Sequence, residues 1–162
     1  MSRETKLIFL IAAVAMVTGF SVPALADTVN CPRNIINRTV DNVFVNGVCT
    51  IRNSTVEGNI VVSTNGNLLL QGSTVKGNVQ AEGGKRVRVQ SDPVSGRETM
   101  INGDVEMFNT VAGLTSAVED AMVGGKIVLD SNFAPINLRR NDVNSDVQVF
   151  QNKARVRLGG NT

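Results

Sequence analysis

The residues best suited to acid–base chemistry in this sequence are Asp104, Lys126 and Asp146, which follow one another at intervals of 22 and 20 residues. Two carboxylates with a lysine between them could exchange protons with a substrate if the fold placed them side by side. The same column of the sequence begins further upstream and reads Asn42, Asn59, Asn78, Asp104, Lys126 and Asp146. Stacked asparagines can hydrogen-bond along a column, and alternating charges relieve repulsion between neighbours. We therefore favour a structural ladder over an acid–base site.

Other enzymatic chemistry has few residues to support it. The sequence contains no histidine, the residue that most often transfers protons in active sites. A calcium-dependent polysaccharide lyase would need an aspartate-bound Ca²⁺ and a basic residue, for which Asp92, Arg97 and Arg88 are the candidates. We expect no catalytic function, no cofactor and no metal site, and we keep the lyase as the less favoured alternative.

Basic residues in the second half of the chain recur at positions that a repeat could bring to one face. They are Lys85, Arg86, Arg88, Arg139, Arg140, Lys153, Arg155 and Arg157. Such a stripe could bind an anionic glycan or another polyanion, because arginine makes bidentate contacts with carboxylate and phosphate groups. The alternative, which we favour, is an ordinary solvated face.

The overall charge argues against general electrostatic attraction. Residues 27–162 carry 14 Lys+Arg (16 minus Arg3 and Lys6) and 13 Asp+Glu (14 minus Glu4). The resulting net charge of +1 predicts no general attraction to nucleic acids or anionic membranes.

The two cysteines, Cys31 and Cys49, lie close together in the sequence. In an exported protein an even cysteine count at close range predicts a disulfide. The alternative, a metal pair, lacks a histidine or a further cysteine to complete the site. We expect a disulfide that fastens residues 27–41 to the first repeat.

A repeat of about 20 residues must position these side chains. It is clearest from Asn59 to Gly77, NIVVSTNGNLLLQGSTVKG. Its copies begin at Asn42, Asn59, Asn78, Asp104, Lys126 and Asp146, at intervals of 17 to 26 residues. Each copy opens with an alternating triplet such as Ile60–Val62, and most have a second triplet such as Leu68–Leu70 after a turn. A period of two is typical of strands, and stacking buries the apolar face that one copy leaves exposed. The sequence predicts an all-β parallel β-helix, or β-solenoid, of about six coils.

A glycine ends four of the copies, at Gly58, Gly77, Gly103 and Gly125, whereas Ser145 occupies this position in the fifth. Recurrent glycine implies either a positive φ or no space for a Cβ atom. A β-sandwich of short strands would not explain equivalent glycines at every return. We expect a relaxed corner at Ser145.

The joints TVEGN (Thr55–Asn59) and TVKGN (Thr74–Asn78), together with Cys49-Thr50-Ile51, carry a resemblance to a known group of proteins. Residues 42–162 resemble secreted bacterial right-handed parallel β-helix repeat proteins of the CT[LI]…TVxGNxxV type. More distantly, the repeat is similar to that of bactofilins, which are polymerising β-helices. The resemblance implies a single-stranded right-handed parallel β-helix. Pectate-lyase-like enzymes share this fold class, but a fold alone does not imply their chemistry.

Two copies depart from the pattern. In the third, the insertion SDPVSGRET (Ser91 to Thr99) predicts a loop that protrudes from the rod. In the fourth, Ser116-Ala117-Val118-Glu119 has the spacing of a helix capping box. Residues 114–123 therefore form either one helical turn or a distorted strand.

The N-terminus has the features of a secretory signal peptide. A basic start with Arg3 and Lys6 precedes an apolar core, Leu7 to Phe20, and Ala24-Leu25-Ala26 matches a cleavage site. The core is shorter than the roughly 20 residues that span a bilayer, so we expect cleavage and no membrane span thereafter. The predicted division is a helical signal peptide at 1–26, a leader or cap at 27–41 and the β-helix at 42–162. The expected location is the periplasm, the cell surface or the exterior.

The last copy stops at Gly159-Gly160-Asn161-Thr162, where a third inward residue and a return turn would come. Solenoid ends need a cover, and an uncovered coil offers unpaired strand groups. Either this end docks with a partner or the chain is a truncated member of its family. We expect a non-catalytic structural or surface-interaction module that forms a homo-oligomer through this coil, with binding of an anionic glycan as the alternative.

Overall fold

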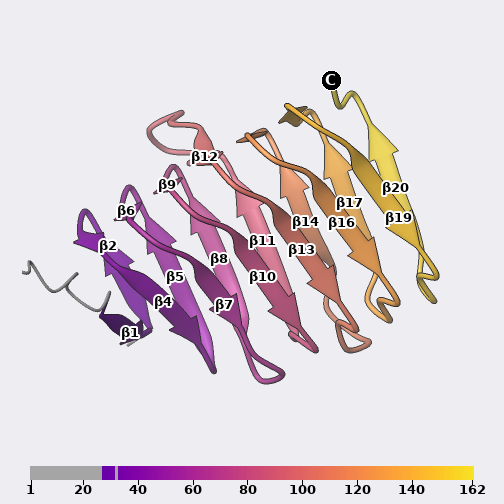
Figure 1. The fold of residues 1–162 in the computed structure, drawn as a ribbon, viewed down its shortest axis with the longest axis horizontal. Coiled ribbons are helices and arrows are strands. Elements are labelled where there is room, and N and C mark those ends of the chain that lie inside the picture. The colour runs from indigo at the N-terminus through magenta and orange to yellow at the C-terminus, as the bar shows by residue number, and fades with distance from the viewer. Residues whose placement is uncertain (1–26, 32) are drawn as a thin grey trace, which may run out of the picture.

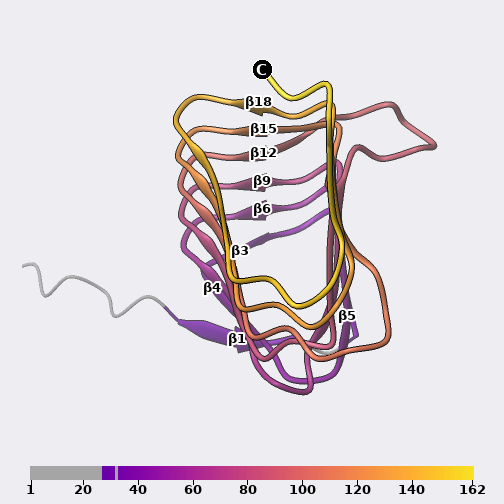
Figure 2. The same ribbon diagram turned by 90° about the vertical axis from the view of Figure 1, so that its right-hand side faces the viewer.

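The computed structural model describes residues 27–31 and 33–162, so the predicted signal peptide lies outside the described residues. In those residues every regular element is a β-strand, and the strands wind into a parallel β-solenoid with three sheets along its length (Figures 1 and 2). The all-β solenoid predicted from the repeat is confirmed.

Each sheet takes one strand from each turn of the solenoid. Sheet A contains β1 (Thr28–Asn30), β4 (Asn42–Val45), β7 (Ile60–Val62), β10 (Val79–Glu82), β13 (Val105–Phe108), β16 (Ile127–Asp130) and β19 (Val147–Phe150). Sheet B contains β2 (Asn34–Ile36), β5 (Val48–Arg52), β8 (Asn67–Gln71), β11 (Arg86–Gln90), β14 (Ser116–Glu119), β17 (Ile136–Arg139) and β20 (Val156–Gly159). Sheet C contains β3 (Thr39–Val40), β6 (Thr55–Val56), β9 (Thr74–Val75), β12 (Thr99–Ile101), β15 (Ala121–Val123) and β18 (Asp142–Val143).

The register of the strands agrees with the alignment of the repeats. Val43 pairs with Ile60, Ile60 with Val79 and Val79 with Val105, and these are the residues that follow successive predicted starts. Three strands precede the first coil predicted from the sequence, namely β1 to β3, and they pair in parallel with its strands. Six turns with three strands each, plus β19 and β20, therefore build the rod.

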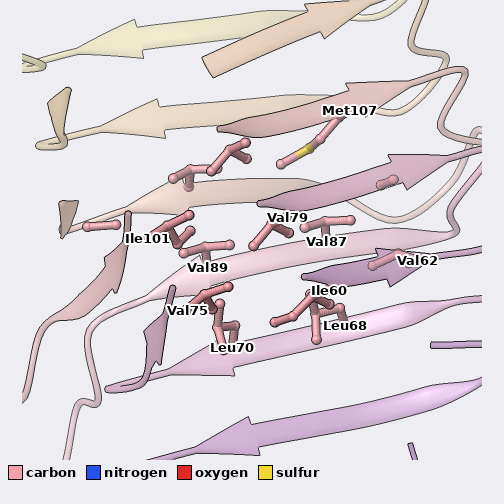
Figure 3. Close-up of a cluster of buried hydrophobic side chains, with 14 of the residues drawn as sticks. Ile60, Val62, Leu68, Leu70, Val75, Val79, Val87, Val89, Ile101 and Met107 are labelled. Atoms are coloured by element: carbon pink, nitrogen blue, oxygen red, sulfur yellow. The ribbon is translucent and has the colours of Figure 1, made fainter. Parts of the chain in front are cut away.

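The core is a set of apolar columns that run along the axis. Inward residues at equivalent positions of successive coils stack on one another, as Leu68 and Val87 do in sheet B (Figure 3). The third inward column, in sheet C, is Val40, Val56, Val75, Ile101, Val123 and Val143, all buried. Because each inward side chain lies between two others at strand spacing, β-branched residues fill the interior without a helix or a second sheet layer.

Both irregular copies keep the solenoid course. The insertion after β11 protrudes beside β12 as an irregular segment, as predicted (Figures 1 and 2). In the fourth copy, Ser116–Glu119 is a strand that pairs with β11 and β17, which decides the question left open by the capping-box spacing. The hydroxyl of buried Ser116 accepts the N–H of Val87, so a polar residue fits an inward position.

The predicted disulfide is confirmed. Cys31 and Cys49 are bonded, with their Cα atoms 5.9 Å apart. Cys31 directly follows β1 and Cys49 lies in β5, so the bond ties the first turn of the solenoid to the second.

Candidate functional site

The column of predicted start residues forms a hydrogen-bond ladder at the corner before sheet A. The side-chain Oδ1 atoms of Asn42, Asn59 and Asn78 each accept the main-chain N–H of the next start residue at 2.8 Å. Asp104 Oδ1 accepts the N–H of Lys126 at 2.9 Å in the same way. These oxygens are therefore occupied by backbone amides, and the contacts favour a structural role for the column over proton transfer.

The glycines that end the copies leave space for this ladder. A Cβ atom on Gly58 would lie 2.2 Å from Asn42 Oδ1, and one on Gly125 would lie 2.0 Å from Asp104 Oδ1. Of the two explanations for recurrent glycine, lack of space is the one that applies, because none of the four has a positive φ. Ser145 holds the position of these glycines in the fifth copy, where the start residue is Lys126. The lysine side chain has no oxygen that could occupy the space a Cβ atom needs.

Further ladders at the other corners were missed in the sequence. Asn132 Oδ1 accepts the N–H of Thr110, and Asn152 Oδ1 accepts the N–H of Asn132, both at 3.0 Å. At the corner between sheets B and C, Asn141 and Asn161 make the equivalent bonds. The available signal was the interval of 20 residues within each pair, which equals the length of one coil.

Asp92, the candidate calcium ligand of the lyase hypothesis, is fully buried. Its carboxylate accepts two hydrogen bonds from Arg52, with Nε at 3.1 Å and Nη2 at 2.9 Å. The Val94 N–H and the Ser95 hydroxyl also donate to it. These hydrogen bonds hold the pKa of the Asp92 carboxyl well below its usual range. Those from Arg52 have the largest effect, and the one from Val94 has the next largest.

The Asp92 contacts anchor the protruding loop and do not leave the carboxylate open to a calcium ion. Arg88, the basic residue of the same hypothesis, donates to Gln90 Oε1 at 2.6 Å. Within residues 27–31 and 33–162, the structure has no cluster of three acidic, histidine or cysteine residues that could hold a metal ion.

Four of the eight predicted basic residues lie on the outer face of sheet B as two pairs. Arg88 opposes Ala117, Ala117 opposes Asn137 and Asn137 opposes Arg157, so the two arginines share a row three strands apart. At about 4.8 Å per strand, their backbones are separated by roughly 14 Å. Arg86 and Arg155 lie two residues before them on the same strand path.

The space between the arginine pairs is a shallow depression. It has a volume of about 270 Å³ and is lined by Thr115, Pro135, Asn137, Arg155 and Arg157. Two of its lining residues, Arg155 and Arg157, carry guanidinium groups that could bind an extended anionic chain.

The remaining predicted basic residues lie elsewhere. Arg139 opposes Glu119 in a different row. Arg140 makes a bidentate ion pair with Asp120, at 2.6 and 2.7 Å, which raises the pKa of Arg140 and lowers that of Asp120. Lys85 and Lys153 lie in the turns between sheets A and B.

A second depression, on sheet A, has two carboxylates among its lining residues. It has a volume of about 260 Å³ and is lined by Val61, Gln80, Ala81, Glu82, Glu106 and Phe108. Gln80 donates to Glu106 at 3.0 Å, and Asn109 donates to Glu82 at 2.7 Å. Glu82 lies in a different outward row from Glu106, so the repeat pattern of the sequence did not pair them.

The last coil exposes side chains that are equivalent to core residues. Leu158 pairs in register with Leu138, and Val149 with Leu129. Leu138 and Leu129 are fully buried, whereas Leu158 is 58 % exposed and Val149 is 38 % exposed. The exposed edges of β19 and β20 have no neighbouring strand in the described chain.

Comparisons with protein-family models, with curated proteins and with solved structures found no match. The described residues include no helix with the length and apolarity needed to cross a membrane.

Proposed function

We propose that this protein is a non-catalytic, exported structural or surface-interaction module that self-associates through its last coil. The observation that carries the proposal is the exposure of Leu158, the end member of a column whose six preceding members are buried in β2, β5, β8, β11, β14 and β17. A coil of a second copy would offer the same strand spacing and the same apolar columns. Stacking would pair free N–H and C=O groups as well as bury apolar surface.

The two ends of the rod differ, which points to the last coil as the associating one. Ile35 in β2 belongs to the same inward column as Leu158 but is only 1 % exposed. The first turn has short strands and is tied down by the Cys31–Cys49 disulfide. Of the two ends of the described solenoid, the one formed by β19 and β20 is the end at which inward apolar columns remain exposed.

The test is the molar mass in solution of the protein recovered after expression of the full chain, measured by light scattering across a range of concentrations and at low and high salt. We expect oligomers that grow with concentration and persist at high salt, because apolar contacts are not screened. A monomer at every concentration would refute the proposal.

Matched variants locate the contact. Val149→Lys combined with Leu158→Lys should yield a monomer, because inward-pointing charges on an edge coil oppose pairing. Val94→Lys, on the loop and 80 % exposed, is the control and should leave the mass unchanged.

A second candidate function is binding of an anionic glycan on sheet B. It is supported by the Arg86–Arg88 and Arg155–Arg157 pairs on either side of the depression lined by Thr115 and Asn137. Arg88→Ser with Arg157→Ser should weaken salt-sensitive binding to an acidic polysaccharide by about tenfold or more, because charged hydrogen bonds are lost. Arg139→Ser, in another row, is the matched control. Equal effects of the two changes would argue against this site.

The resemblance to secreted right-handed β-helix repeat proteins supports two finer parts of the proposal. One is a right-handed winding, the usual hand for connections between parallel strands. The other is export with removal of residues 1–26, which mass spectrometry of the protein from the periplasm or medium would test. An intact N-terminus on cytoplasmic protein would refute export.

A further inference from the structure

One long edge of the rod, where the chain turns from sheet A to sheet B, carries exposed apolar side chains between lysines (lower edge in Figure 1). The turns stack through main-chain hydrogen bonds. Val111 N–H donates to Gly84 O at 3.2 Å, Phe133 N–H to Thr110 O at 2.9 Å and Lys153 N–H to Asn132 O at 2.8 Å. These bonds place Lys85, Val111, Phe133 and Lys153 in one column on four successive coils.

The apolar members of this column point to solvent instead of the core. Phe133 is 51 % exposed, Val111 is 36 % exposed, and Leu114 from the same turn as Val111 is 49 % exposed. The inward positions beside them are already filled by Ala134, Thr110 and Asn132, all buried. The exposed residues therefore do not contribute to the solenoid core, and their exposure costs solvation free energy unless something covers them.

Cations surround this apolar group on the side of sheet B. Lys85, Lys153 and Arg155 are exposed, and Arg86 Nε donates to Thr115 O at 3.2 Å beside Leu114. Glu82 and Asp130, the acids at the ends of β10 and β16, lie on the sheet A side and accept hydrogen bonds from Asn109 and Ser131. We call Lys85, Val111, Leu114, Phe133, Lys153 and Arg155 the corner patch.

We propose that the corner patch binds the surface of a membrane that contains anionic lipids. Peripheral membrane binding combines apolar side chains that enter the interface with basic side chains that meet anionic headgroups. A soluble polyanion would use the cations but has no need of Phe133 and Leu114. The net charge of the chain is small, so attraction comes from the local arrangement and acts only within about a Debye length.

The absence of tryptophan and tyrosine from the sequence makes a site-specific test possible. Phe133→Trp introduces a single tryptophan into the corner patch, and Val94→Trp introduces one on the loop, outside it. All proteins are recovered after expression of the full chain, so the N-terminal segment is the same in each. With phosphatidylcholine vesicles containing phosphatidylglycerol, Trp emission from Phe133→Trp should shift to the blue and that from Val94→Trp should not. No shift for Phe133→Trp, or equal shifts for both, would overturn the proposal.

Vesicle co-sedimentation then separates the apolar and ionic parts. Leu114→Ser with Phe133→Ser should reduce binding by about tenfold or more, since each removes a large apolar group from the interface. Lys85→Ser and Lys153→Ser should each reduce it by about fivefold, and binding should fall as phosphatidylglycerol is withdrawn. Val94→Ser is the apolar control and Arg139→Ser the ionic control, and both should bind as the parent does.

An outcome in which the soluble polysaccharide competes fully and the Leu114 and Phe133 changes have no effect would assign the cations to a soluble anion. That outcome would overturn the membrane proposal. It would leave self-association through the last coil unaffected, because that proposal depends on Val149 and Leu158, which continue the inward columns, and neither residue belongs to the corner patch.

Discussion

The side chain of Asn78 occupies the space that a Cβ atom on Gly103 would need. Such an atom would lie 2.0 Å from Asn78 Oδ1, and the same oxygen accepts the N–H of Asp104 at 2.8 Å. The glycine and the asparagine belong to neighbouring coils, so together they set how closely two turns of the solenoid can approach. The same relationship recurs at Gly58 with Asn42 and at Gly77 with Asn59.

Gly103→Ala should therefore destabilise the protein by about 2–4 kcal/mol, through steric strain and loss of the ladder hydrogen bond. The free energy of unfolding from urea titration measures the effect. Ser145→Ala, where Lys126 offers no oxygen, should change stability by less than about 0.5 kcal/mol. In an Asn78→Ala background the cost of Gly103→Ala should shrink. An unchanged cost in that background would contradict the assignment of the clash to the Asn78 side chain, because the Gly77 main-chain oxygen would also lie 2.8 Å from the added Cβ atom.

Equivalent leucines in one column should differ in their contribution to stability. Leu70 is fully buried between coils, so Leu70→Ala should cost about 2–5 kcal/mol of unfolding free energy. Leu158 has a coil on one side only, and Leu158→Ala should cost less than about 1 kcal/mol at a concentration where the protein is monomeric. If Leu70→Ala and Leu158→Ala lowered the unfolding free energy equally, Leu158 would have to be covered in solution.

Removal of the Cys31–Cys49 disulfide should lower stability by about 3 kcal/mol in the chain-entropy model, given a separation of 18 residues. Cys31→Ala with Cys49→Ala is the variant, and the urea midpoint is the measurement. A reductant should shift the midpoint of the parent towards that of the variant and leave the variant itself unchanged. A reductant effect on the variant would point to a different cause.

The ion pair of buried Asp92 with partly exposed Arg52 should make stability depend on pH at the acidic end. The pKa of the Asp92 carboxyl is lowered in the folded protein, so the unfolded chain binds a proton more readily. Its stabilising contribution is therefore complete above the unfolded pKa of about 3.9 and declines as the pH falls further. Asp92→Asn should lower the urea midpoint at neutral pH, and the difference from the parent should narrow below about pH 4.

The exposed pair of Arg140 and Asp120 supplies the control for that prediction. Arg140→Ala should change the midpoint little at any pH, because exposed ion pairs are well screened. The urea midpoints of Asp92→Asn and the parent could instead differ by the same amount from neutral to acidic pH. That result would contradict the assignment of the effect to the Asp92 carboxylate.

The repeat could be recognised in the sequence because stacking requires apolar residues at the same inward positions of every coil. Ile60, Leu70 and Val75 occur at inward positions of one copy, and apolar residues recur at the equivalent positions of the others, since each column must be filled along its length. The two cysteines could likewise be paired from their number and closeness. Residues 28–40 were harder to recognise as a turn because they lack the glycine joint and have short strands.

The fourth copy illustrates where local pattern is insufficient. Ser116 and Glu119 have the spacing of a capping box, but Ala117 and Val118 lie between β11 and β17, whose backbone groups are already aligned for pairing. Parallel pairing on both sides satisfies more hydrogen bonds than one isolated helical turn, so tertiary context decides the strand.

The sequence alone determined the period, the inward columns, the parallel solenoid and the disulfide, because these follow from side-chain types that repeat at the length of a coil. The tertiary structure decided which side chains from different coils meet. The contact of Arg52 with Asp92 spans 40 residues and depends on the course of an irregular loop. Phe133 and Lys153 become neighbours only when unlike turns stack. Outward side chains do not pack in the core, so their types do not repeat from coil to coil. Which of them lie together on the surface is therefore known only from the fold.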